Sequence, residues 1–286
     1  MSLVPTSELI AAAVDSGRAV AAFNVITLEH AEAVAEGVAR AGSGGNGGAI
    51  LQLSENAIRF HGGDPRPILA ACRAIAEQAG VPLSLHLDHI EDPALIDLAI
   101  ANAELWGLGS LMIDASRLDY AANVAATADA VRRARAVSLW VEAELGEIGG
   151  KDGAHAPGVR TDPDEAAAFV AATGVGALAV AVGSSHAMRD RTAGVDTALV
   201  ARIAERVPVP LVLHGSSGVD DANISAAVIA GIRKVNVGTA LNIAGTAAIR
   251  GVLAADPDAV DPRGYLRHSR DAMAEVVASF CAVVAS

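Results

Sequence analysis

The chain has 286 residues, of which 52% are hydrophobic and 3% aromatic, and its formal net charge is −12. This length suits one large domain or two of ordinary size, and no apolar stretch approaches the roughly 20 residues of a membrane span. A nucleic-acid binder would need a basic face, so we expect neither a nucleic-acid nor a membrane partner. The first residues lack a signal-peptide pattern. Two isolated cysteines, Cys72 and Cys281, predict reduced thiols in a cytoplasmic protein.

Eight short apolar runs alternate with longer amphipathic segments along the chain. Their continuous Val, Ala, Leu and Ile content indicates buried parallel strands. Several of the segments between them begin at Asp-Pro or stop at Gly, as helices do, and Thr27 is an expected N-cap. The expected strands lie at 19–25, 48–54, 82–89, 110–116, 138–145, 177–183, 209–215 and 233–239.

This regular alternation predicts a single (β/α)₈ TIM barrel over residues 1–286, with an extra C-terminal helix from DPRGYLRHSRDAMAEVVASF. The alternative is a doubly wound open sheet. Polar residues finish nearly every expected strand, however, whereas an open sheet concentrates its chemistry near one switch point. The GSGGNG stretch at 42–47 matches a dinucleotide fingerprint, but it precedes a strand instead of joining a strand to a helix.

Three of the expected strands lead into a histidine: PLSLHLDH ends at His89, ALAVAVGSSH at His186 and VPLVLHG passes through His214. The carboxyl ends of parallel barrel strands meet on one face, so these imidazoles are expected to converge. Three imidazoles with an open fourth position suit zinc, although cobalt, iron and manganese are also compatible.

Carboxylates lie at neighbouring strand ends. Asp88 precedes His89 and has two readings, an acid/base group or a carboxylate that orients an imidazole. Alternation places His86 on the same face as Asp88, one layer deeper, as a core residue. Glu142 and Glu144 share a face, where they could hold a second metal position or accept hydrogen bonds from the histidines.

Two loops after the seventh and eighth strands, HGSSG (214–218) and NVGT (236–239), resemble the phosphate-binding loops of barrels. The long loop 144–163 is Gly-rich and charged, as active-site lids often are. The chain has only two lysines, Lys151 and Lys234, and neither stands at a strand's carboxyl end. A Schiff-base mechanism is therefore disfavoured, and carbonyl chemistry would depend on a metal.

Together these residues resemble the class II, metal-dependent ketose-bisphosphate aldolases, which include fructose-bisphosphate and tagatose-bisphosphate aldolases. The resemblance spans nearly the whole chain. It rests on motifs in family order: AFNV, QLSENA, HLDH, SLMIDAS, VEAELGEIGG, VGSSH, LVLHGSSG and KVNVGT.

The resemblance implies a role for each matched residue. His89, His186 and His214 would hold zinc, with Asp114 and Glu144 at alternate metal positions, and a second divalent or a monovalent cation is also allowed. Asp88 would exchange a proton with the substrate's C4 hydroxyl. Glu147 and Asp152 are candidates for the second proton carrier. The substrate-binding positions are Asn24, Ser54, Gly215, Ser217, Asn236, Gly238, Thr239 and Arg270, the last taking a second phosphate in its own or a neighbouring subunit's site.

Some positions depart from the family pattern. Gly238 stands where many members carry Ala or Asp, and Ala187 replaces a Gly that often follows the second histidine. The expected activity is cleavage of fructose 1,6-bisphosphate to dihydroxyacetone phosphate and glyceraldehyde 3-phosphate, a reaction of glycolysis, by a homodimer or homotetramer. The alternatives are a tagatose-bisphosphate or related class II aldolase, a zinc-dependent barrel hydrolase and a non-catalytic sugar-phosphate-binding subunit.

Overall fold

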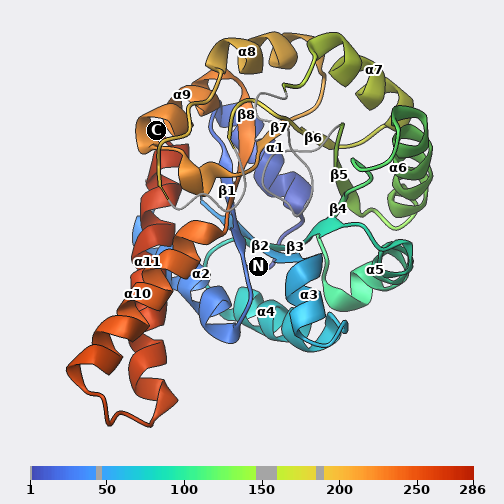
Figure 1. The fold of residues 1–286 in the computed structure, drawn as a ribbon. Coiled ribbons are helices and arrows are strands. Elements are labelled where there is room, and N and C mark those ends of the chain that lie inside the picture. The colour runs from blue at the N-terminus through green and yellow to red at the C-terminus, as the bar shows by residue number, and fades with distance from the viewer. Residues whose placement is uncertain (1, 43–46, 146–159, 185–189) are drawn as a thin grey trace.

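The computed structural model describes residues 2–42, 47–145, 160–184 and 190–286. Eight parallel strands close into a barrel in the order β1 to β8, with helices around it (Figure 1). The (β/α)₈ prediction is confirmed. The strands are β1 Val20–Asn24, β2 Ala49–Ser54, β3 Leu83–Ile90, β4 Ser110–Ile113, β5 Trp140–Glu144, β6 Ala177–Ala179, β7 Leu211–Leu213 and β8 Ile232–Val237.

The helices follow the expected βα alternation, with two additions that the sequence pattern did not reveal. One is α1, which precedes the first strand, and the other is the short α3 after β2. Thr27 is the N-cap of α2, as expected. The helices are α1 Thr6–Ser16, α2 Leu28–Ala41, α3 Glu55–Phe60, α4 Arg66–Gln78, α5 Pro93–Trp106, α6 Tyr120–Arg135, α7 Pro163–Thr173, α8 Thr197–Arg206, α9 Asp221–Ala230, α10 Thr239–Ala255 and α11 Pro262–Val284.

The inside of the barrel holds both polar and apolar side chains. Side chains alternate along each strand, so every second residue faces the barrel interior. One sector of the interior is a cluster of small and flexible apolar residues from β4, β6 and β7 and the segment after β6, formed by Met112, Ala177, Ala179, Ala181 and Val212. Elsewhere the interior also contains polar side chains with no exposed area, among them Gln52, His86, Glu142 and Lys234.

Helix α1 closes the amino end of the barrel and contacts β1, β3 and β8. The hydroxyl of Thr6 in its first turn lies 2.7 Å from that of Ser84 and 2.6 Å from that of Ser110. The Ser110 hydroxyl in turn lies 2.7 Å from Nδ1 of His86. A buried hydrogen-bonded column therefore runs upward from α1 into the barrel.

Strand β3 is irregular near its carboxyl end. Its pairing with β4 shifts register between Leu87 and Ile90. His89, within this interval, has a φ of 50°, which is a left-handed backbone conformation rarely adopted by a non-glycine residue.

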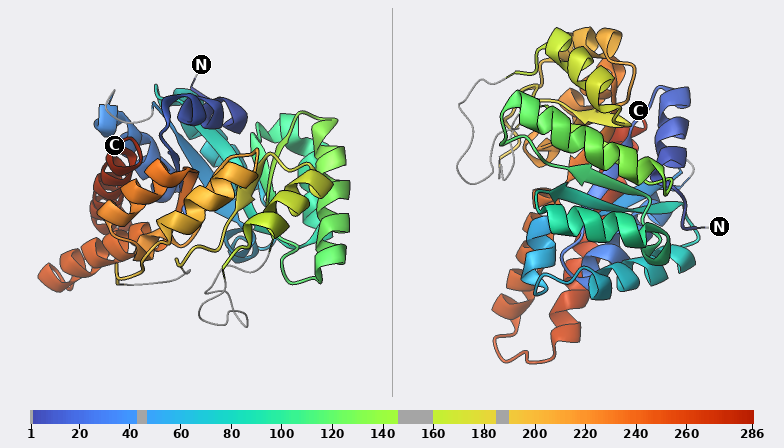
Figure 2. Two further views of the ribbon diagram at one scale, coloured as in Figure 1. Left: turned by 90° about the horizontal axis from the view of Figure 1, so that it is seen from above. Right: turned by 90° about the vertical axis from the view of Figure 1, so that its right-hand side faces the viewer.

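Helices α10 and α11 pack against each other, and their joined ends project from the barrel as an arm (Figures 1 and 2). Helix α11 also lies along α2 on the outside of the barrel. Within the described parts of the chain, none of the helices combines the length and apolar character required to traverse a bilayer.

Candidate functional site

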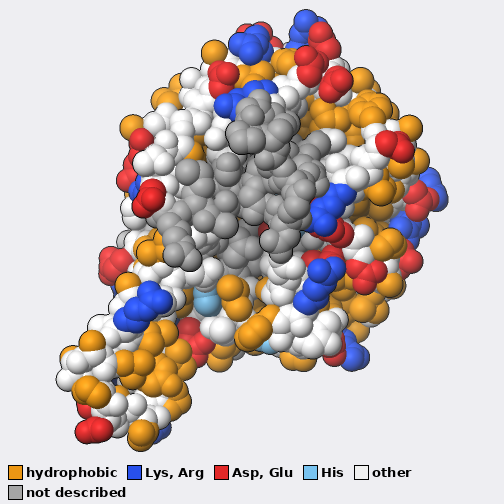
Figure 3. All heavy atoms as spheres, in the orientation of Figure 1, with side chains coloured by type: hydrophobic (Ala, Val, Ile, Leu, Met, Phe, Trp, Pro, Cys, Tyr) orange, Lys and Arg blue, Asp and Glu red, His pale blue; other side chains and the backbone are white. Residues whose placement is uncertain are grey.

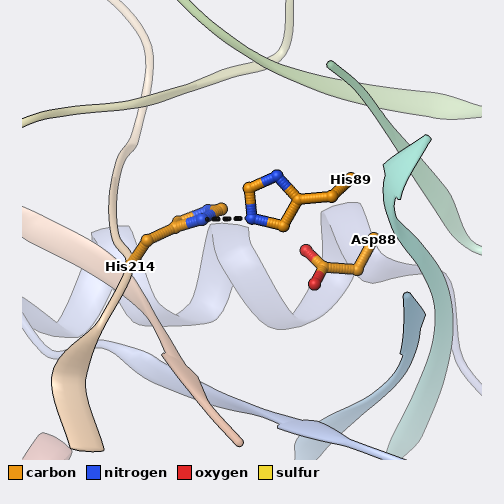
Figure 4. A group of neighbouring side chains, drawn as sticks. All are labelled: Asp88, His89 and His214. Carbon is orange, nitrogen blue, oxygen red and sulfur yellow. Dashed lines mark hydrogen bonds between the residues drawn. The ribbon is translucent and has the colours of Figure 1, made fainter. Parts of the chain in front are cut away.

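Asp88, His89 and His214 meet at the carboxyl end of the barrel (Figure 4). Nδ1 of His214 and Nε2 of His89 face each other across 2.9 Å, and the two rings are nearly perpendicular. Each of the three residues offers an N or O donor atom within 4.8 Å of the others. The expected convergence of these strand ends is therefore present for His89 and His214. His186 lies outside the described residues.

His89 is also part of a second cluster, with Asp114 and Glu144. Its Nδ1 lies 2.8 Å from Oδ2 of Asp114, and the hydroxyl of Ser116 donates to the other carboxylate oxygen at 2.6 Å. Both carboxylates are buried. Since one ring nitrogen of His89 faces His214 and the other faces Asp114, the imidazole joins two donor sets that could each hold a cation.

On the far side of His214, Nε2 lies 3.0 Å from Oε1 of Glu142 and 3.1 Å from the amide Nδ2 of Asn236. Lys234 donates to the second oxygen of Glu142 at 2.6 Å. Burial would raise the pKa of Glu142, but Lys234 and His214 outweigh it and lower that pKa. Burial is also the main cause of a lowered pKa for His214. A neutral imidazole is the form that binds metals.

Asp88 lies beneath the two imidazoles, between two amides. Asn24 donates to one of its oxygens at 3.5 Å, and Asn236 donates to the other at 3.4 Å. Burial would raise the pKa of Asp88, but its electrostatic interactions with the imidazoles of His89 and His214 more than offset it and lower the pKa to about 2. The carboxylate is therefore ionised at neutral pH and able to accept a proton.

The two predicted phosphate loops are tied together beside this cluster. Gly215 has a left-handed φ of 68° and leads into a 3₁₀ turn over Ser216–Gly218. The hydroxyl of Ser217 accepts from the backbone N–H of Ala240 at 3.1 Å, in the first turn of α10. Thr239 is the first residue of α10, so the N-terminus of a long helix opens at this position, which favours anions.

Gly238 has a local reason for lacking a side chain. An added Cβ would lie 2.8 Å from Oδ1 of Asn24, so the glycine leaves room for that amide. Gln52 donates to the same Oδ1 at 2.9 Å and fixes its orientation. The departure from the family pattern at Gly238 therefore accompanies the placement of Asn24 beside Asp88.

Four other predicted site residues are not part of this arrangement or lie outside the described residues. Ser54 caps α3, its hydroxyl accepting from Ala57 N–H at 3.2 Å. Arg270 pairs with Glu32 of α2 at 2.9 Å, on the outside of the barrel. The loop candidates for the second proton carrier, Glu147 and Asp152, lie outside the described residues.

The donor set fits a divalent metal. Facing imidazole nitrogens with neighbouring carboxylate oxygens are the ligands of zinc and of related first-row ions. The contact of Glu142 with His214 is one of the two roles expected for Glu142 from the sequence, whereas the pairing of Glu142 with Lys234 was not predicted. The only signal was a lysine within an otherwise apolar strand that alternates inward with Asn236.

A parallel (β/α)₈ barrel with such a cluster at the carboxyl ends of its strands belongs to the class of metal-dependent barrel enzymes. The family model for class-II fructose-bisphosphate aldolase matches residues 4–286, and the chain belongs to this family. It is a metal-dependent aldolase, an aldehyde-lyase.

Solved structures agree with this assignment. The YdjI aldolase from Escherichia coli K12 is 30% identical, with a TM-score of 0.83 over 99% of this chain and 97% of that one. A putative fructose-1,6-bisphosphate aldolase from Coccidioides immitis is 28% identical, with a TM-score of 0.81 over 98% and 95%. The fructose-bisphosphate aldolase from Campylobacter jejuni, at 22% identity, shares the fold with a TM-score of 0.82 over 99% and 95%.

Proposed function

We propose that residues 1–286 act as one aldolase domain that reversibly cleaves fructose 1,6-bisphosphate to dihydroxyacetone phosphate and glyceraldehyde 3-phosphate. The observation that carries this proposal is the position of Asp88 beside the facing nitrogens of His89 and His214. Aldol cleavage of a ketose needs a base for the hydroxyl proton and a Lewis acid for the carbonyl. The ionised carboxylate can serve as the base, and the two facing imidazole nitrogens can hold the metal.

The metal in this proposal is zinc. His89, His214 and His186 are its proposed ligands, and Asp114 and Glu144 provide an alternate position that shares His89. When bound, the ion supplies a Lewis acid for the carbonyl of the ketose. A second cation, divalent or monovalent, has carboxylate oxygens available at the same end of the barrel.

The chain's own residues carry the protons. The Asp88 carboxylate accepts the proton of the C4 hydroxyl, the C3–C4 bond breaks, and C4 becomes the aldehyde carbon. The electron pair of that bond passes to C3 and the adjacent carbonyl. The amides of Asn24 and Asn236 hold the carboxylate in place for this transfer. Protonation of C3 by an acid of the long loop, Glu147 or Asp152, completes dihydroxyacetone phosphate.

The phosphate of the dihydroxyacetone half would bind at the two tied loops. Backbone N–H groups of Gly215, Ser217, Gly238 and Thr239 and the N-terminus of α10 form the proposed cradle. Asn236 is a further proposed substrate contact, and Ser54 would contribute only if its hydroxyl can serve the substrate as well as the cap of α3. Binding the phosphate there orients the reacting carbons over Asp88 and contributes to the rate through positioning.

A direct assay tests the reaction. The zinc-loaded protein is incubated with fructose 1,6-bisphosphate, tagatose 1,6-bisphosphate and fructose 1-phosphate, and triose phosphate is measured by coupled reduction. We expect the highest kcat/KM with fructose 1,6-bisphosphate and loss of activity after exhaustive chelation. A higher kcat/KM with tagatose 1,6-bisphosphate would identify that sugar as the substrate instead. Release of inorganic phosphate without triose phosphate would indicate a hydrolase, and binding without turnover would indicate a non-catalytic relative.

We also propose a homodimer or homotetramer working in the cytoplasm. The arm formed by α10 and α11 projects from the barrel and carries hydrophobic side chains on its visible face (Figure 3). Leu253 in α10 and Val260 between α10 and α11 are exposed, Val260 at 89%. A second copy covering this surface would remove that apolar area from water. Sedimentation of the purified protein at micromolar concentration would give the oligomer mass; a monomer would contradict this part of the proposal.

A further inference from the structure

Lys234 is one of only two lysines in the chain, and its side chain has no exposed area. It points into the barrel from β8, two residues before Asn236, and its Nζ donates to Oε2 of Glu142 on β5 at 2.6 Å. Glu142 is likewise fully buried. A buried ion pair is usually no more stabilising than apolar residues of the same volume. The adjoining sector of the barrel is in fact filled by Ala, Met and Val.

The oxygen of Glu142 that does not contact Lys234 contacts His214 instead. Oε1 lies 3.0 Å from Nε2 of His214, and Nδ1 of the same ring faces Nε2 of His89 at 2.9 Å. A carboxylate oxygen can only accept a hydrogen bond, so it requires a proton on Nε2. With the proton there, the lone pair of Nδ1 points toward His89, where a shared cation would lie.

Asn236 favours the opposite arrangement. Its Nδ2, which also faces Asp88 at 3.4 Å, lies 3.1 Å from Nε2 of His214. An amide N–H is a donor, so this contact alone would make Nε2 the acceptor and move the proton to Nδ1. The two neighbours of Nε2 therefore select different tautomers, and a charged acceptor outweighs a neutral donor.

We propose that Glu142 and Lys234 are positioning residues that set the tautomer of His214, so that Nδ1 is presented to the metal. Glu142 accepts from Nε2–H, while Lys234 holds the other oxygen and compensates the carboxylate's buried charge. Carboxylates that accept from metal-ligating histidines commonly raise metal affinity by 10- to 100-fold. The inference rests on the proposed function only where it assigns the metal to His89 and His214.

The decisive variant is Glu142→Leu/Lys234→Met, which replaces the ion pair by apolar residues of similar size and is expected to fold. Ring nitrogen shifts of ¹⁵N-histidine-labelled, metal-free protein report the tautomer, with the His214 signals assigned by their loss in His214→Asn. We expect Nε2–H in the parent and Nδ1–H in the double variant. Zinc affinity, measured by competition with a chromophoric chelator, should fall by about 10- to 100-fold.

A second variant isolates the part played by Lys234. In Glu142→Gln, the lysine needs an acceptor and should attract the amide oxygen, which turns the amide NH₂ toward His214 and again moves the proton to Nδ1. Met112→Leu is the control, because Met112 pairs with Glu142 in the β4–β5 register but makes no polar contact there. It should leave both tautomer and zinc affinity unchanged.

Retention of Nε2–H in Glu142→Leu/Lys234→Met, with zinc affinity within about twofold of the parent, would overturn the proposal. If that variant does not fold, Glu142→Gln decides by the same two measurements. A parent protein that binds zinc and shows these tautomers but cleaves no sugar bisphosphate would contradict the proposed function and leave the positioning role intact.

Discussion

Asp88 and His89 are adjacent in β3, yet both side chains point into the same cluster at the carboxyl end of the barrel (Figure 4). Regular alternation would send neighbouring residues to opposite faces of a strand. The register shift between Leu87 and Ile90, together with the left-handed φ of 50° at His89, turns the imidazole inward beside the carboxylate. Such a backbone conformation costs on the order of 1–3 kcal/mol, which the surrounding contacts must offset.

Glu55 supplies part of that support. Its buried carboxylate accepts from the backbone N–H groups of Glu91 at 2.6 Å and Asp92 at 3.0 Å, directly after the irregular turn. We expect Glu55→Ala to lower the free energy of unfolding by about 1–2 kcal/mol, because two partly exposed backbone donors lose a charged acceptor. Urea unfolding of the metal-free protein measures this. Glu55→Gln keeps an acceptor oxygen and should recover most of the loss; equal stability of the Ala and Gln variants would argue against this support.

Removing the proposed base tests the chemistry directly. Asp88→Ala should lower kcat by about 10²–10⁴-fold, because the C4 hydroxyl loses its proton acceptor. The variant should still bind zinc, since His89 and His214 keep their facing nitrogens. Turnover with fructose 1,6-bisphosphate and zinc content after dialysis are the two measurements. Near-normal turnover would remove Asp88 from the mechanism, and loss of the metal would assign it to the metal site.

The barrel and the approach of His89 to His214 could be predicted because both follow from periodicity. Eight apolar runs separated by helical segments specify the topology, and that topology brings the carboxyl ends of strands together. The contact between Lys234 and Glu142 could not be predicted in this way. Their strands, β8 and β5, are not neighbours in the barrel, so the contact depends on how side chains from different strands pack across the barrel interior.

Two other features depend on tertiary context in a similar manner. Helix α1 has no strand before it, so βα alternation does not indicate that it closes the amino end of the barrel. The turn at His89 is stabilised by contacts such as those of Glu55, and although histidine adopts a left-handed conformation more often than most residues, the residue type alone does not predict one here. Sequence patterns report the local periodicity of apolar residues, whereas these features depend on contacts between residues that are distant in the chain.

We expect the buried His86 to lower the free energy of unfolding as the pH falls into the mildly acidic range. Burial is the main cause that lowers its pKa from 6.5 to about 3. Between these values the unfolded chain binds a proton that the folded protein does not, so His86 contributes a loss of about 1.4 kcal/mol per pH unit as pH falls from 6.5 toward 3. His86→Asn keeps a partner for Ser110 at the position of Nδ1 and should remove that share of the slope. Urea unfolding of metal-free protein between pH 7 and 5 measures it; parallel slopes in parent and variant would contradict the prediction.

Arg270 tests whether the active site is completed by a neighbouring copy. It pairs with Glu32 on the outside of its own barrel, so its proposed phosphate role requires a second subunit. Arg270→Ala should raise KM for fructose 1,6-bisphosphate by about 10-fold or more, as expected for loss of a charged hydrogen bond, and leave KM for fructose 1-phosphate unchanged. Arg40→Ala is the matched control, because Arg40 also joins α2 to α11, through Glu275, without a predicted substrate contact. Equal KM changes for both substrates, or the same change in the control, would mean that Arg270 acts only by holding the helices together.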